Sequence, residues 1–171
     1  MDTAEFKKHI LPFREKLYRI ALSLLSDKQE AEDTIQDTYL KLWNMRKQLS
    51  EYRSIEALAV TMTKNQCFDK LKSYKHRKQD NTDVGTIPLV GVAPLPDRST
   101  EIKDKMKVFN QILNSLPEQQ KLMVHLREVE QYEYDEIVEM TGVARGTLRV
   151  MLSRARKKIR AEYMKKYSHE D

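Results

Sequence analysis

The chain has 171 residues, of which 33% are charged and only 4 are glycine, and its net charge at pH 7 is +5. Its one cysteine excludes an intramolecular disulfide, and its four scattered histidines show no metal-ligand spacing, so we expect no metal and no other cofactor. The sequence has no secretory signal pattern and no apolar run long enough to cross a bilayer, so we expect a cytoplasmic protein without membrane insertion.

Apolar residues recur at helical spacing over residues 6–25 and predict a first helix. Its apolar stripe consists of Phe6, Ile10, Phe13, Leu17, Ile20, Ala21 and Leu24. The next two residues, Ser26 and Asp27, predict a helix stop followed by a new N-cap.

A second helix is predicted over residues 28–49, and it has two contrasting faces. Ile35, Tyr39 and Leu42 share one side, which we expect in the hydrophobic core. The opposite side carries Asp33, Gln36, Asp37 and Leu40. A leucine among carboxylates and an amide fits a basic partner with an apolar contact. Single exposed leucines are also common on ordinary surfaces, so the sequence alone leaves both interpretations open.

A third helix is predicted over residues 55–76. Val60, Cys67, Leu71 and Tyr74 form one stripe, which predicts that Cys67 is a core residue and not a nucleophile. A second stripe consists of Asn65, Asp69, Lys72 and His76, and Lys64, Lys70, Lys75, Arg77 and Lys78 make the C-terminal half basic. This pattern indicates a nucleic-acid surface, although basic residues near a helix C-terminus also stabilise the helix dipole.

Helical periodicity stops over residues 79–100, where Gly85, Pro88, Gly91, Pro94 and Pro96 occur together. We interpret this segment as a flexible linker between domains at residues 1–78 and 101–171. Fully extended, it could span about 70 Å. Its apolar residues either dock on a partner or lie on the chain's own domains.

The last third of the sequence predicts a helix-turn-helix: an acidic helix, a turn at Gly142 and a basic amphipathic helix. Residues 145–166 carry nine Lys/Arg against one acid, whereas residues 128–139 carry six acids and no base. The basic helix has an apolar stripe of Leu148, Met151, Leu152, Ala155 and Ile159. Its opposite side holds Gly146, Arg149, Val150, Ser153, Arg154, Lys157 and Arg160. Such a face suits base edges flanked by phosphates, and the alternative is a solvated basic face on a structural helix.

Three motifs carry a resemblance to a known family. Residues 31–43 (AEDTIQDTYLKLW) resemble the core-binding helix of the extracytoplasmic-function sigma factors of bacterial RNA polymerase. Residues 61–71 (TMTKNQCFDKL) are similar to their promoter-melting helix. Residues 142–160, preceded by the motif LPEQQ at 116–120, resemble their promoter-reading helix-turn-helix. The motifs occur in the family's order and span nearly the whole chain.

The resemblance implies an all-α protein of two small helical domains, sigma region 2 at residues 1–78 and sigma region 4 at residues 101–171. It implies an alternative sigma factor that binds bacterial core RNA polymerase and directs initiation at particular promoters, without being an enzyme itself. Core polymerase and promoter DNA are the implied partners. Whether an anti-sigma protein also sequesters the chain is not decided by the sequence.

The resemblance also assigns candidate sites, none of them catalytic, cofactor-binding or metal-binding. For core polymerase binding the residues are Asp33, Gln36, Asp37 and Leu40. For the minus-ten element they are Tyr52, Lys64, Asn65, Asp69 and Lys72, with the aromatic side chain and Asn65 at the pocket for a flipped base. For the minus-thirty-five element they are Arg149, Val150, Ser153, Arg154, Arg156 and Lys157.

The sequence departs from the family pattern at several positions. The loop at residues 50–56 is short, and Leu58 stands where tryptophan is frequent in the family. Of the implied sites, the resemblance therefore supports the flipped-base pocket least directly. Ala144 replaces a common Ser/Thr cap.

Two other classes of protein are alternatives. A DNA-binding regulator that acts without polymerase leaves the face with Asp33 and Leu40 unexplained. An enzyme acting on nucleic acid lacks both a paired-carboxylate metal site and an activated nucleophile.

Overall fold

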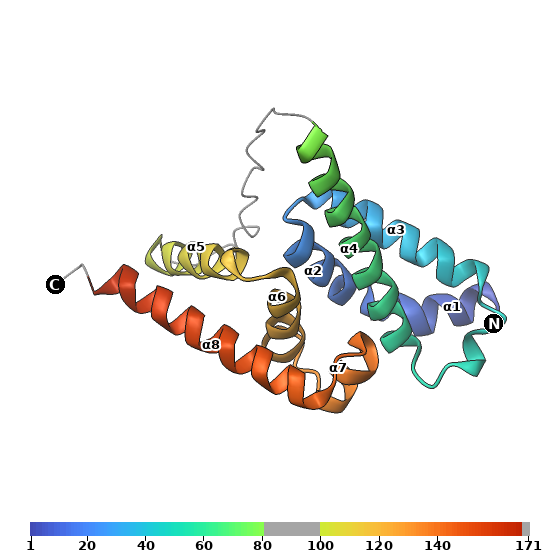
Figure 1. Cartoon of the computed structure of the whole chain (residues 1–171). Coiled ribbons are helices and arrows are strands. Elements are labelled where there is room, and N and C mark those ends of the chain that lie inside the picture. The colour runs from blue at the N-terminus through green and yellow to red at the C-terminus, as the bar shows by residue number, and fades with distance from the viewer. Residues whose placement is uncertain (81–99, 169–171) are drawn as a thin grey trace. The chain divides into compact units, whose positions relative to one another are not determined.

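The computed structural model describes residues 1–80 and 100–168, and the regular secondary structure in these ranges is entirely helical. The predicted all-α fold class is therefore confirmed. The helices belong to two compact units, which are described separately (Figure 1). The linker expected at residues 79–100 lies outside the described residues except at its two ends, which are helical.

The first unit begins with two helices where the sequence pattern predicted one. Helix α1 spans Thr3–Ile10, a 3₁₀ helix spans Leu11–Phe13, and α2 spans Arg14–Leu25. The expectation of one continuous helix was wrong because Pro12 lacks a backbone N–H and its ring clashes with the carbonyl four residues earlier. The apolar periodicity continues through the break, since both helices bury the same stripe.

Helix α3 spans Lys28–Asn44 and begins as predicted. Ser26 ends α2 in the left-handed conformation with φ 53°, and the Asp27 side chain accepts a hydrogen bond from the Glu30 N–H at 3.1 Å. The helix ends earlier than the expected residue 49. The Trp43 carbonyl at the helix end accepts hydrogen bonds from the Arg46 N–H at 3.2 Å and from the Arg46 side chain at 2.9 Å, and the guanidinium lies 4.1 Å over the Trp43 ring.

Helix α4 spans Ile55–Asp80, four residues beyond the expected end at residue 76. Helices α2, α3 and α4 pack against one another, and each contributes to a common apolar core (Figure 1). The fully buried side chains include Leu17, Ile20, Ile35, Leu42, Val60 and Cys67. Cys67 is fully buried, which confirms that it is a core residue, and burial raises the pKa of its thiol to about 12.

Polar contacts between α3 and α4 fix how the two helices lie side by side. The Gln66 amide donates to the Thr38 hydroxyl at 2.9 Å, and that hydroxyl donates to the Thr34 carbonyl at 2.9 Å. Lys70 lies 3.3 Å from the Glu30 carboxylate. Tyr39, expected in the core, is only half-buried, and its hydroxyl donates to the Ile10 carbonyl at 2.9 Å.

The C-terminal part of the chain, residues 100–168, contains the predicted helix-turn-helix. Its helices are α5 (Thr100–Ser115), α6 (Glu118–Val124) followed by a π-helical turn (His125–Val129), α7 (Tyr134–Thr141) and α8 (Arg145–Tyr167). Helix α8 packs against α5 and α6. Leu148, Leu152 and Ala155 are fully buried, as the apolar stripe predicted.

The turn between α7 and α8 depends on two backbone positions. Gly142 has φ +71°, a left-handed conformation that glycine adopts without steric strain. Ala144 is the N-cap of α8 and offers no side-chain hydrogen bond to the first turn. The start of the basic helix therefore lacks one stabilising contact that a hydroxyl would provide.

Ala144→Ser should raise the free energy of unfolding of this unit by about 1 kcal/mol, because a serine N-cap accepts a hydrogen bond from a first-turn N–H. Chemical denaturation followed by circular dichroism measures the change. The matched control is Ala161→Ser, at an exposed position inside α8, which should lower stability by about 0.5 kcal/mol. Equal effects at the two positions would show that capping does not limit this helix.

Candidate nucleic-acid and partner interfaces

One face of α3 presents the four residues expected to bind core polymerase. We call Asp33, Gln36, Asp37 and Leu40 the α3 surface. Leu40 is 59% exposed, and the opposite side of the helix is buried through Thr34, Ile35, Thr38 and Leu42. Asp33 is half-buried and accepts a hydrogen bond from the Gln29 amide at 3.0 Å. The structure therefore brings together an exposed apolar side chain and two carboxylates on one helix face.

Helix α4 carries three of the five residues expected at the minus-ten element on one exposed stripe. Asn65, Asp69 and Lys72 follow one another at helical spacing, and all are exposed. Lys64 lies off this stripe and is half-buried, and burial lowers the pKa of its ammonium group. We call Asn65, Asp69 and Lys72 the α4 stripe.

Tyr52 lies away from the α4 stripe. It is 43% exposed and precedes the first residue of α4, whereas Asn65 lies ten residues into that helix. At 1.5 Å per residue this is about 15 Å along the helix axis. A pocket that places both residues around one flipped base therefore stays a prediction, and it would need the loop before α4 to bring Tyr52 toward Asn65.

Lys70 is a basic residue that the structure removes from the expected nucleic-acid surface. Its ammonium contacts both the carboxylate and the carbonyl of Glu30, at 3.3 and 3.4 Å. Tyr74 also bonds to Glu30, and burial together with that bond raises its pKa to about 12. These residues attach α4 to α3, and no local spacing rule predicts this because the partners are 40 residues apart.

Helix α8 exposes the residues expected to contact the minus-thirty-five element. Arg149, Val150, Ser153, Arg154 and Lys157 are all exposed on the side opposite the buried stripe, and we call them the α8 face. Val150 is 46% exposed although it is apolar. The helix therefore presents charged, hydroxyl and methyl groups together, which are the groups that base edges and phosphates require.

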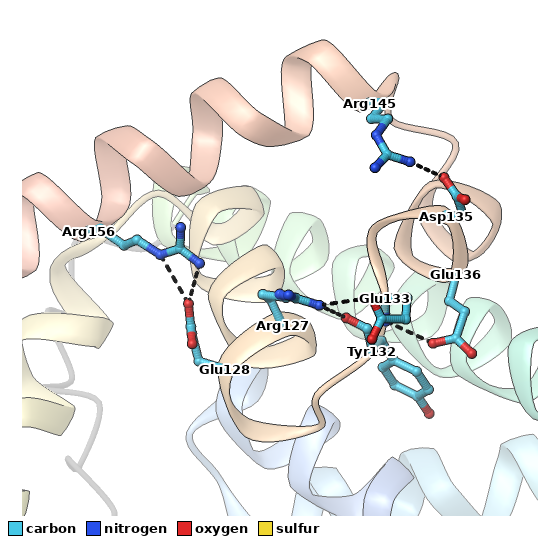
Figure 2. Close-up of polar contacts among 8 residues, drawn as sticks. All are labelled: Arg127, Glu128, Tyr132, Glu133, Asp135, Glu136, Arg145 and Arg156. Atoms are coloured by element: carbon cyan, nitrogen blue, oxygen red, sulfur yellow. Dashed lines mark hydrogen bonds and ion pairs between the residues drawn. The ribbon is translucent and has the colours of Figure 1, made fainter.

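Two arginines of α8 form ion pairs with acids that precede the helix (Figure 2). Arg156, another of the residues expected on the minus-thirty-five element, donates to Glu128 Oε1, with Nε at 3.0 Å. This hydrogen bond raises the pKa of Arg156 above its ordinary value. Arg145 pairs with Asp135 at the start of α7. In the sequence these two acids belong to the acidic segment at residues 128–139, and no local spacing pairs them with α8.

A third arginine holds the loop before α7. Arg127 donates to the Tyr132 carbonyl at 2.9 Å (Figure 2). Its guanidinium also lies 4.8 Å from the centre of the Tyr134 ring. The N–H of Glu133 donates to the Glu136 carboxylate at 2.9 Å, which satisfies a backbone group at the start of α7. These contacts fix the first helix of the helix-turn-helix within its own unit.

Both units correspond to known sequence families. Residues 10–77 match Sigma-70 region 2, and residues 107–159 match Sigma-70 region 4. The chain is 25% identical over 154 residues to the ECF RNA polymerase sigma factor SigM of Mycobacterium tuberculosis, a match that covers 90% of this chain and 72% of that protein. The chain belongs to the extracytoplasmic-function sigma factors. The α3 surface and the α4 stripe lie within region 2, and the α8 face lies within region 4.

Further relatives agree with this membership. The RNA polymerase sigma-H factor of Pseudomonas aeruginosa is 25% identical to this sigma factor over 172 residues, which cover 92% of this chain and 86% of that protein. The probable RNA polymerase sigma factor RfaY of Xanthomonas campestris is 24% identical over 150 residues, and the match covers 86% of this chain. The sigma factor described here spans only 38% of the length of RfaY.

A solved structure has the same fold. The sigma factor RpoE of Bartonella quintana, crystallised with the anti-sigma factor NepR, is 26% identical and superimposes with a TM-score of 0.79. The match covers 92% of this chain and 96% of that chain.

Family membership makes this protein an alternative sigma factor that directs transcription. A DNA-binding regulator that acts without polymerase is not favoured, because region 2 is matched as well as the helix-turn-helix. Among residues 1–80 and 100–168, no helix has the length and apolar character needed to span a membrane.

Proposed function

We propose that this sigma factor binds core RNA polymerase through the α3 surface and recognises promoter DNA through the α4 stripe, Tyr52 and the α8 face. The observation that carries the proposal is Leu40, which is 59% exposed beside the carboxylate of the preceding turn on a helix whose other side is buried. The protein acts in the cytoplasm as a regulator of the polymerase, and the polymerase supplies all the chemistry.

Core binding combines an apolar anchor with orienting charges. Burying Leu40 in a pocket of the partner removes its side chain from water, and Asp37 steers basic groups of the partner into place. The helix itself does not need to change, because Ile35 and Leu42 already hold its other side in the domain core.

Recognition of the minus-ten element uses the unpaired strand. Stacking of a base on an exposed aromatic side chain contributes about 1 to 3 kcal/mol, which helps to offset the stacking lost when the duplex opens. Tyr52 supplies such a ring. Asn65 hydrogen-bonds a different nucleotide of the unpaired strand. Lys72 contacts the phosphate backbone between these nucleotides and the duplex DNA.

Recognition of the minus-thirty-five element uses the α8 face in the major groove. Arg149 and Arg154 have the donor geometry to read guanine edges, and Ser153 can donate to or accept from a base. Lys157 contacts phosphate and positions the helix without reading sequence.

Val150 should give a preference for thymine at one position of the minus-thirty-five element. An apolar side chain cannot hydrogen-bond, and the major-groove feature that rewards it is the thymine methyl. The contact is worth about 0.8 kcal/mol, so the preference should be a few-fold. Replacing that thymine with uracil should reproduce most of the loss, measured as binding of holoenzyme to promoter variants. In a Val150→Ala background uracil should have little further effect, and additive losses would contradict the contact.

We propose an anti-sigma protein as a further partner of this chain, by similarity. The Bartonella structure pairs its sigma factor with an anti-sigma factor, and the match covers nearly all of both chains. An anti-sigma protein that sequesters this sigma factor should lower the amount of holoenzyme formed at a fixed core polymerase concentration.

The proposed function is tested by adding the purified chain to bacterial core RNA polymerase on a genomic DNA library and mapping the transcript starts. We expect starts that core polymerase alone does not give, preceded by two shared sequence elements. Association with core polymerase is measured in parallel. DNA binding without that association would favour the polymerase-independent regulator and overturn the proposal.

A further inference from the structure

Two ion-paired arginines lie on the same edge of the recognition helix. Arg145 and Arg156 are eleven residues apart, which is close to three helical turns and about 16 Å along α8. The edge on which they lie is the one where the α8 face meets the buried stripe, and Arg149 lies next to it, further toward the centre of the α8 face. Figure 2 shows both side chains reaching from α8 toward acids of the preceding segment.

Both pairs are exposed to solvent. The side chains of Arg156 and Glu128 are 48% and 49% exposed, and those of Arg145 and Asp135 are 51% and 86% exposed. Ion pairs at this level of exposure contribute little to folding stability. Their partners are therefore not locked in place, and another anion can replace either carboxylate.

A DNA phosphate is the anion best suited to replace them. Guanidinium groups bind phosphate and carboxylate with the same forked donor geometry. Residues at the border of a groove-facing surface lie nearest to the sugar–phosphate strands that form the walls of the groove. Arg145 is also the first residue of α8, where the helix dipole and free N–H groups favour negative charge.

We propose that Arg145 is a further contact to the DNA backbone, and that Asp135 and Glu128 compete with DNA phosphates for Arg145 and Arg156. The inference rests on the proposed role of α8 in promoter recognition. The two carboxylates lower the affinity of the helix for phosphates of any sequence. A larger share of the remaining binding then comes from Arg149, Val150 and their neighbours, which meet base edges.

The test measures binding of the intact chain to a fluorescent duplex of random sequence over a range of salt concentrations. Glu128→Gln and Asp135→Asn should each tighten binding about two- to fivefold, because each frees one arginine from an exposed ion pair. The matched control is Glu101→Gln. It removes the same charge and an ion pair of 3.0 Å to Lys105, but that pair lies on α5, and DNA affinity should be unchanged.

Combining each carboxamide variant with alanine at its partner arginine separates competition for that arginine from a general change in net charge. The gain from Glu128→Gln should disappear when Arg156 is already alanine, and the gain from Asp135→Asn should disappear when Arg145 is already alanine. A gain that persists in these backgrounds would overturn the inference. So would unchanged or weaker binding by the carboxamide variants with an intact fold by circular dichroism, because the carboxylates would then position the arginines or play no part.

The same preparations separate this inference from the proposed function. Wild-type holoenzyme that initiates at mapped promoters, together with carboxamide variants that bind DNA no more tightly, overturns only the competition. Wild-type protein that supports no promoter-dependent initiation overturns the proposed function itself.

Discussion

Leu40→Asp should weaken binding to core RNA polymerase at least about thirtyfold, the loss typical of a central interface anchor. Leu40 is the apolar residue of the α3 surface, and its exposed side chain would gain free energy from burial in a partner. An aspartate at this position would instead place a charge in the partner's apolar pocket. The affinity is measured by titrating labelled sigma factor with core polymerase. Helix content and melting temperature should stay nearly unchanged.

Three further variants sharpen this test. Asp37→Lys should also weaken binding, because it reverses an orienting charge on the same surface. Leu11→Asp is the matched control, since Leu11 is a leucine 45% exposed in the same unit but outside α3, and binding should not change. Ile35→Asp should instead unfold the unit, because its side chain is 1% exposed and a buried charge has no partner there. An unaltered affinity for Leu40→Asp would show that α3 is not the contact.

Periodicity was sufficient to predict most of the fold. It placed the buried sides of α3, α4 and α8, although several residues of these stripes, such as Tyr39, Leu71 and Met151, are only half-buried. An apolar stripe that repeats at three and four residues is removed from water only when that side of the helix packs inward. It could not show where helices stop. The break at Pro12 and the early end of α3 after Asn44 depend on single backbone groups, which an apolar stripe does not record.

The candidate sites were predicted where the side chains project to solvent from one helix. The α3 surface and the α8 face follow directly from helical spacing, and their exposure in the structure agrees. Contacts between helices were not predictable from spacing. Lys70 turns to Glu30 and Arg156 to Glu128, partners that are 40 and 28 residues away in the sequence. Only the packing of the helices brings these opposite charges together.

These contacts change how basic residues should be counted in promoter recognition. Lys70 contributes to the attachment of α4, and the charges of Arg145 and Arg156 are each offset by a carboxylate. On the groove-facing side of the recognition helix, the exposed cations outside these ion pairs include Arg149, Arg154 and Lys157 of the α8 face. Residues of that face should divide into those that read bases and those that only hold the backbone.

Arg149→Ala and Arg154→Ala should each reduce discrimination at a single base pair by about 1 to 3 kcal/mol, because a bidentate arginine distinguishes guanine from other bases in the major groove. Lys157→Ala should instead weaken binding to all sequences by a similar factor and lower the salt dependence by about one counterion. Holoenzyme binding to a series of promoter variants at several salt concentrations measures both effects.

Arg156→Ala provides the internal comparison. It should also act uniformly across sequences, but more weakly than Lys157→Ala, because Glu128 already offsets part of the charge that Arg156 offers to phosphate. If all four alanine variants change affinity alike, with no position of the promoter losing its preference, the division between reading and positioning residues is wrong. If Arg149→Ala removes the base preference at one promoter position while Lys157→Ala removes none, α8 reads the major groove through side chains on the side opposite its buried stripe.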